Sequence, residues 1–148
     1  MDGVEQIVYI NLAERPEKQR LIETELRRCV PKNSARRFDA IKLPNSTGYG
    51  VDGYIGSYMS HIAVLKMAMN AGWANCLILE DDAAFNRFDQ GDAVLAKLMA
   101  APYDVILLGG LGHCDPVTYR ITSPCQTSIA YLVTRDYYSL RKSYVRQI

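Results

Sequence analysis

Runs of apolar residues alternate along the chain with segments in which apolar positions recur every three or four residues. The apolar runs that lack polar alternation are typical of strands buried on both faces of a parallel sheet. Shorter runs rich in β-branched and aromatic residues predict further strands. The strand candidates are 7–10, 37–41, 76–79, 104–108, 118–122 and 128–134.

Helices are predicted between these strands, wherever the spacing of three to four residues is sustained. Their expected ranges are 16–30, 54–71, 92–101 and 136–146. Pro16 suits the first position of its helix, and Gly72 suits a C-terminal cap. The stripe expected to face the core in the second helix consists of Tyr58, Ile62, Leu65 and Met69.

The alternation of strands with helices predicts an α/β layered domain. Residues 42–53 fit neither pattern, and their proline, asparagine and glycines predict a loop of about a dozen residues. At 148 residues the chain is expected to form one domain, 1–148, with a substantial core.

Composition narrows the classes of partner. The formal net charge is +1, which offers no electrostatic reason for binding nucleic acid or an anionic membrane. No run reaches the roughly 18 apolar residues of a membrane-spanning helix, and the start of the chain lacks a basic secretory signal. The four cysteines are widely spaced without a Cys-x-x-Cys pair, so we expect reduced thiols and no zinc site. These features predict a soluble cytoplasmic domain.

The strand at 76–79 ends in consecutive carboxylates at Glu80, Asp81 and Asp82. Ligands of open α/β sheets bind at the carboxyl ends of such strands. Acidic groups held together repel one another, and a hard cation such as Mg²⁺ or Mn²⁺ relieves that repulsion while bridging to a diphosphate. An equally compatible interpretation is that these acids cap the helix that follows.

Two helix starts carry polar residues that suit a ligand. Asn11 and Arg15 follow the first strand, where backbone N–H groups and a guanidinium could hold a nucleotide, and a solvated helix start is the alternative. Ser57, Ser60 and His61 lie within about one turn of the next helix, where the imidazole could contact a substrate or remain structural. No Gly-x-Ser-x-Gly or His-Glu-x-x-His pattern surrounds them, which argues against a serine hydrolase or a zinc protease.

The strand at 104–108 runs into a glycine-rich segment, 109–112. This segment lacks the Gly-Lys-Ser/Thr ending of a P-loop, so we interpret its glycines as allowing close approach of the backbone to a ligand. His113 and Asp115 follow at once and could reach a metal or act as a base, with an exposed turn as the alternative.

Taken in order, these segments resemble glycosyltransferase family 25. That family includes lipooligosaccharide galactosyltransferases, which act in lipopolysaccharide biosynthesis, and the collagen galactosyltransferases. The similarity covers nearly the whole chain, and its most specific part is the Gly-x-x-Gly-Ser-x-x-Ser-His block followed by the acidic strand end. The matching segments are 8–12 with Arg15 and Arg20, 37–40, 53–61, 77–82, 104–109 and 130–133.

The resemblance implies a GT-A-like, Rossmann-like domain with a mixed, mostly parallel central sheet flanked by helices. It implies inverting transfer of a sugar, commonly galactose, from a UDP-sugar to a saccharide or glycoconjugate acceptor, using Mn²⁺ or Mg²⁺. By this similarity Asp81 and Asp82 bind the metal, and Asp82 is also catalytic. Asp115, from its place after the glycine segment, is our candidate for the base that takes the acceptor proton. The expected nucleotide-sugar contacts are Asn11, Arg15, Ser57, Ser60, His61 and Glu80.

The chain departs from the family by stopping at Ile148, where family members usually continue. We therefore expect a C-terminally short member. The alternative function is a catalytically incomplete domain that binds a nucleotide-sugar or a protein partner. The tyrosines near the end of the chain could form a homo-oligomer interface, and amphipathic packing within the domain explains them equally well. A metal-dependent phosphohydrolase is a weaker alternative, because an acidic strand end also suits that chemistry.

Overall fold

The computed structural model describes residues 3–30, 35–44, 51–85, 88–111, 113–124 and 126–138. Within these ranges five strands form one sheet, and three helices cover it. The strands are β1 (Gln6–Asn11), β2 (Ala35–Asp39), β3 (Asn75–Glu80), β4 (Val105–Leu111) and β5 (Gln126–Thr134). The helices are α1 (Pro16–Cys29), α2 (Val51–Ala71) and α3 (Phe88–Met99).

The sheet is mixed, and its strand order is β2-β1-β3-β5-β4. β1 pairs in parallel with both β2 and β3, whereas β5 pairs antiparallel with both β3 and β4. The predicted α/β class, with a mixed sheet flanked by helices, is therefore confirmed.

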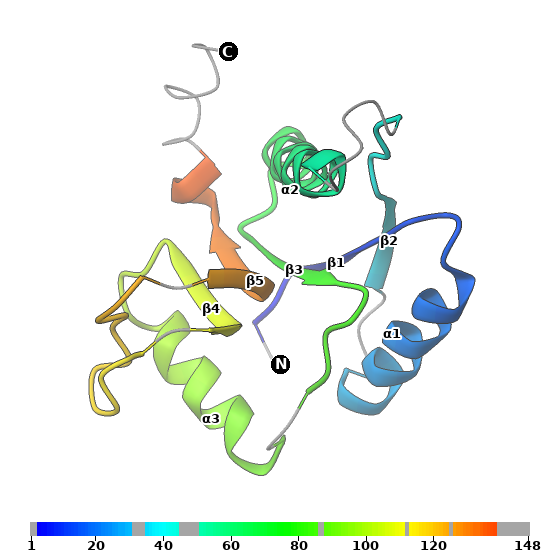
Figure 1. Ribbon diagram of the computed structural model, residues 1–148. Coiled ribbons are helices and arrows are strands. Elements are labelled where there is room, and N and C mark those ends of the chain that lie inside the picture. The colour runs from blue at the N-terminus through cyan, green and yellow to red at the C-terminus, as the bar shows by residue number, and fades with distance from the viewer. Residues whose placement is uncertain are drawn as a thin grey trace.

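Helices cover both faces of the sheet (Figure 1). α1 and α3 lie on one face, where Ile22 and Leu95 pack with Leu77 in one apolar cluster. α2 lies on the opposite face, where Val64 and Ala68 belong to a second cluster. Successive strand residues point to opposite faces, so β1 and β3 supply side chains to both clusters.

The apolar run that predicted a doubly buried strand is confirmed in β3. Its residues Cys76, Leu77, Ile78 and Leu79 are all fully buried. Burial raises the pKa of the Cys76 thiol to about 12, because the thiolate would lose its hydration there. Cys76 is thus a core residue of the sheet, as expected from the sequence.

α1 begins at Pro16, as predicted, since proline has a suitable φ angle and needs no hydrogen bond for its nitrogen there. Its buried residues are Ile22 and Leu26. Leu21, the apolar neighbour of Ile22 in the sequence, is 60% exposed. The helix therefore contacts the sheet through a narrow stripe.

The stripe predicted for α2 is confirmed only in part, since Leu65 and Met69 pack partly buried against the second cluster. The buried residues of this helix are small or polar and recur at every fourth position, namely Asp52, Gly56, Ser60, Val64 and Ala68. Tyr58, predicted to face the core, is 49% exposed. Small side chains let the helix backbone approach its neighbours closely, and that packing overrides the preference for burying the largest apolar groups.

Other boundaries differ from the sequence prediction. α2 begins at Val51, inside the segment expected to be a loop, and residues 45–50 lie outside the described ranges. β4 continues through Gly109 to Leu111, so these residues pair with β5 instead of forming a ligand loop, and Gly112 lies outside the described ranges. Gly72 has a φ of 71° and ends α2 as predicted.

The strand expected at 118–122 is not formed, because only an isolated bridge joins Cys114 to Ile121. The expected terminal helix is described only at residues 135–138, which are helical. The rest of that predicted helix, with Cys125 of the cysteine set, lies outside the described residues. No helix in the described part of the chain is long and apolar enough to cross a bilayer.

Candidate functional site

A pocket of about 330 Å³ opens at the carboxyl edge of the parallel strands. β1 and the turn after it contribute Ile10, Leu12 and Arg15, and the segment after β2 contributes residues 40–43. The remaining wall residues come from the first half of α2 and the end of β3, and they are Asp52, Gly53, Ser57, His61, Glu80 and Asp81. This volume is in the range of small-molecule sites.

The pocket lies where the chain reverses its direction across the sheet. From β1 the chain passes through α1 to β2, and from β2 it returns through α2 to β3 on the other side of β1. The two connecting helices lie on opposite faces of the sheet (Figure 1), and the pocket lies beyond the ends of β1 and β3. Open α/β sheets bind their ligands at such switch points.

Glu80 reaches the pocket on the α2 side of the sheet. Its Oε1 lies 3.2 Å from Nε2 of His61, whose Nδ1 lies 2.8 Å from the hydroxyl of Tyr131 on β5. Tyr131 is 8% exposed, so this end of the contact is buried. We call the Tyr131–His61–Glu80 contact the His61 brace.

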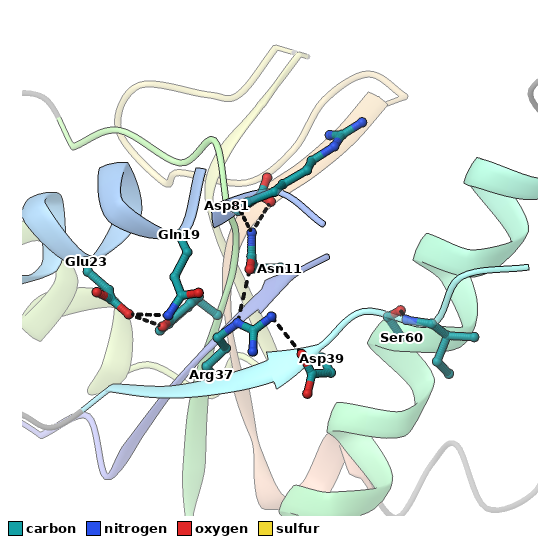
Figure 2. A network of polar contacts seen from close by, with 10 residues as sticks. Asn11, Gln19, Glu23, Arg37, Asp39, Ser60 and Asp81 are labelled. Atoms are coloured by element: carbon teal, nitrogen blue, oxygen red, sulfur yellow. Dashed lines mark hydrogen bonds and ion pairs between the residues drawn. The ribbon is translucent and has the colours of Figure 1, made fainter. Parts of the chain in front are cut away.

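Asp81 is held from β1 and β2 (Figure 2). Asn11 donates from Nδ2 to Oδ2 of Asp81 at 2.8 Å and to the carbonyl of Arg15 at 3.1 Å. Nε of Arg37 donates to Oδ1 of Asn11 at 3.0 Å, and the same guanidinium pairs with Asp39. We call the Arg37–Asn11–Asp81 contact the Asn11 brace.

Asn11 was predicted to contact a nucleotide, but it does not line the pocket. Its side chain is 1% exposed, and both its amide nitrogen and its oxygen are used within the protein. The donors and acceptors around it fix the orientation of the amide. Asn11 therefore holds Asp81 from inside the protein rather than contacting the pocket.

Ser60 is likewise part of the wall rather than the surface of the pocket. Its hydroxyl is fully buried, accepts from the Ile41 N–H at 2.8 Å and donates to the Gly56 carbonyl at 2.7 Å. A Cβ on Gly56 would overlap the Ile41 carbonyl oxygen. Gly56 and Ser60 together let the segment after β2 lie directly against α2.

Arg15, Ser57 and His61, three of the residues expected to contact a nucleotide-sugar, line the pocket. Arg15 is exposed and sits one residue before α1. Lys42 also lines the pocket and is paired with Glu14 at 2.6 Å. The pocket thus has two basic residues, Arg15 and Lys42, as well as the carboxylates of Asp52, Glu80 and Asp81, a combination suited to an anionic ligand that carries a cation.

Asp82 is exposed in the turn after β3 and is not among the residues that line the pocket. The structure therefore places the two predicted metal ligands differently, with Asp81 in the pocket and Asp82 outside it. Adjacent residues leave a strand end in different directions, which the sequence could not resolve.

Asp115, our candidate base, lies between β4 and β5 and does not line the pocket. Its Oδ1 accepts hydrogen bonds from the backbone N–H groups of Val117 and Thr118 and from the Thr118 hydroxyl. The bonds from Thr118, foremost, hold the pKa of this carboxyl below its usual value. The lowered pKa and the absence of Asp115 from the pocket lining both argue for a turn-forming role.

Tyr131, Arg37 and Asp52 belong to the site or its support and were not predicted. Tyr131 lies 70 positions from His61 in the sequence, and Arg37 lies 26 positions from Asn11. No local pattern connects such pairs. Asp52 lies inside the segment expected to be a loop, and its burial depends on α2 starting earlier than predicted.

No group of three or more His, Cys, Asp or Glu side chains gathers for a metal within the described ranges. Mg²⁺-type cations, however, are commonly held by one or two carboxylates together with substrate phosphates. Glu80 and Asp81 each use one oxygen in a brace, and their other oxygens have no partner among the described residues. These hard oxygen donors fit a cation that arrives with a diphosphate.

Comparison of the sequence with protein-family models finds no match, and a search of curated proteins finds none.

Proposed function

We propose that the chain is a metal-dependent glycosyltransferase that binds a UDP-sugar in the pocket beyond the ends of β1 and β3. In this proposal a sugar, galactose in the first instance, passes with inversion to a hydroxyl of a saccharide or glycoconjugate. The observation that carries the proposal is that Glu80 and Asp81 share one pocket with Arg15 and His61. The ordered resemblance to glycosyltransferase family 25 supports the same assignment.

In this proposal the acidic and basic residues of the pocket bind different parts of the ligand. Glu80 and Asp81 would hold Mn²⁺ or Mg²⁺ through their unbraced oxygens, and Arg15 would contact the anionic phosphates. A cation in this place supplies positive charge for the diphosphate that leaves as the sugar–oxygen bond breaks. Ser57 and His61 lie on the α2 wall, within reach of a ligand in the same pocket.

The direct test is calorimetric titration of the chain with UDP, with and without Mn²⁺. We expect UDP to bind at least about tenfold more tightly when Mn²⁺ is present, because the cation offsets repulsion between carboxylates and phosphates. Mn²⁺ alone should bind weakly, since the protein provides few ligands. No UDP binding at millimolar concentration with Mn²⁺ present would sink the proposal.

Asp81→Asn and Asp82→Asn form a matched pair for this titration, because each removes one charge from the same turn. We expect Asp81→Asn to abolish the gain from Mn²⁺ and Asp82→Asn to leave most of it. The reverse result would place the metal outside the pocket, on the residue that the sequence prediction treats as catalytic.

The alternative, a catalytically incomplete domain that binds a nucleotide-sugar, is favoured by the placement of Asp115. The residue proposed from the sequence as base does not line the pocket, and its Oδ1 accepts three hydrogen bonds within a turn. Incubation with UDP-galactose, Mn²⁺ and a panel of saccharide acceptors separates the two functions. Release of UDP supports the transferase, and tight binding of UDP-galactose without release supports the incomplete domain.

A further inference from the structure

The two carboxylates of the pocket are held from opposite faces of the sheet. The His61 brace reaches Glu80 on the face covered by α2. In the Asn11 brace, Arg37 pairs in register with Tyr9, so its side chain belongs to the face covered by α1. Each brace engages one oxygen of its carboxylate, Oε1 of Glu80 or Oδ2 of Asp81. The other oxygen of each is left for the pocket.

Hydrogen-bond chemistry gives the His61 brace a direction. An ionised Glu80 can only accept, so Nε2 of His61 must donate to it. In a neutral imidazole Nδ1 then accepts, and the hydroxyl of Tyr131 donates to it. No side-chain nitrogen or oxygen buried in the described part of the chain lacks a partner, and this holds for the buried end of the brace.

Adjacent carboxylates repel each other, and an unsupported glutamate would swing toward water to relieve that repulsion. Fixing such a side chain costs conformational entropy. A hydrogen bond that already holds the side chain before the ligand binds reduces the entropy lost on binding. Groups that orient metal ligands in this way usually matter to affinity almost as much as the ligands.

We propose that Tyr131 and His61 are positioning residues, which hold Glu80 so that its second oxygen faces the ligand of the pocket. The Asn11 brace does the same for Asp81 from the other face. This assignment rests on the proposed function for the identity of the ligand, a divalent cation with a nucleoside diphosphate. The existence of the brace itself does not depend on it.

Tyr131→Phe tests the proposal, because it removes one hydroxyl and keeps the ring. The matched control is Tyr9→Phe, since Tyr9 is also buried, donates to Glu23 at 2.7 Å and does not line the pocket. We expect Tyr131→Phe to weaken UDP binding in the presence of Mn²⁺ by about tenfold, and Tyr9→Phe to leave it unchanged. Equal affinities in all three proteins would overturn the proposal, whatever happens to their melting temperatures.

His61→Phe and His61→Gln test whether a hydrogen-bond donor at position 61 is enough to restore UDP binding. Phenylalanine removes both hydrogen bonds, whereas the glutamine amide can still donate to Glu80. We expect His61→Phe to lose at least about tenfold in UDP affinity and His61→Gln to recover part of it. A purely structural histidine would lower the melting temperature of both variants without this split in affinity.

Nitrogen-15 NMR of the imidazoles provides a readout that needs no ligand. The sequence has two histidines, and His113 is exposed, so it serves as an internal reference. At pH 8 we expect Tyr131→Phe to move the Nδ1 resonance of His61 and Glu80→Gln to move its Nε2 resonance, with His113 unchanged. Unmoved His61 signals would show that the brace does not form. If the wild-type protein does not bind UDP but the His61 resonances shift in these variants, the proposed function is wrong and the His61 brace is still confirmed.

Discussion

At Gly56 the absence of a side chain sets how closely α2 approaches the wall of the pocket. Any Cβ there would overlap the carbonyl oxygen of Ile41, and the hydroxyl of Ser60 bonds the N–H of the same residue. These two small residues explain why α2 buries a face of small side chains. In the Gly-x-x-Gly-Ser-x-x-Ser-His block, the second glycine (Gly56) and the second serine (Ser60) are thus explained by packing.

Gly56→Ala should therefore destabilise the protein, against the usual gain from alanine in a helix. We expect a loss of about 1–3 kcal/mol in the free energy of unfolding, because the backbone of residues 40–43 must move away. Urea denaturation measures the change. The same displacement should weaken UDP binding, since these residues line the pocket.

Gly91→Ala is the matched control in α3. No atom lies within 4 Å of a Cβ built at Gly91, so alanine meets open space there. We expect a gain of about 0.5–1 kcal/mol, from the lower backbone entropy of the unfolded chain and the higher helix propensity. Equal effects of the two substitutions would contradict the close contact at Gly56.

Between β4 and β5, the connecting segment depends on one carboxylate for its shape. Oδ1 of Asp115 accepts hydrogen bonds from the N–H groups of Val117 and Thr118. The backbone N–H of Asp115 donates to the carbonyl of Arg120, and its carbonyl accepts from the N–H of Tyr119. Tyr119 takes a positive φ of 58° within this turn. The segment read from the sequence as a catalytic position and a strand is a turn built on Asp115.

The pH dependence of stability follows from this turn. The folded pKa of Asp115 is lowered below 3.8, chiefly by its bonds from Thr118. A lowered pKa gives stability that is present above the unfolded pKa and is lost as the pH falls through the folded value. We expect Asp115→Asn to be less stable than wild type at pH 7, with the difference narrowing below pH 4. Melting curves across that range measure it, and a constant difference would contradict the assignment.

Across the whole molecule, the sheet is sealed between two helical layers, and Cys76 lies at its centre. Burial raises the pKa of its thiol to about 12, whereas Cys114 is exposed. Alkylation requires the thiolate, so reaction at Cys76 reports global opening of the fold.

Treatment of the native protein with iodoacetamide should modify Cys114 readily and Cys76 hardly at all. Peptide mass spectrometry separates the two sites. We expect the rate at Cys76 to rise steeply through the urea transition, while the rate at Cys114 changes little. Equal rates at the two cysteines in the absence of urea would show that the α2 layer does not seal the sheet.

The elements predicted most accurately are those set by local pattern. β1, β3 and β5 carry apolar runs that leave few alternatives, and α1 has proline at its start. The errors arise where packing selects among several possible faces or partners. By sequence pattern Tyr58 fits an apolar stripe and Gly56 does not. The close approach of α2 to Ile41 nevertheless buries the glycine and leaves the tyrosine half exposed.

The sequence by itself determined the alternation of strands and helices and an acidic end on a doubly buried strand, because period and apolar runs are properties of neighbouring residues. Only the tertiary structure decided that Glu80 and Asp81 face the pocket while Asp82 faces solvent. It also brought together His61 and Tyr131, which lie 70 positions apart. Such contacts depend on strand order and register, which arise from the packing of the whole sheet.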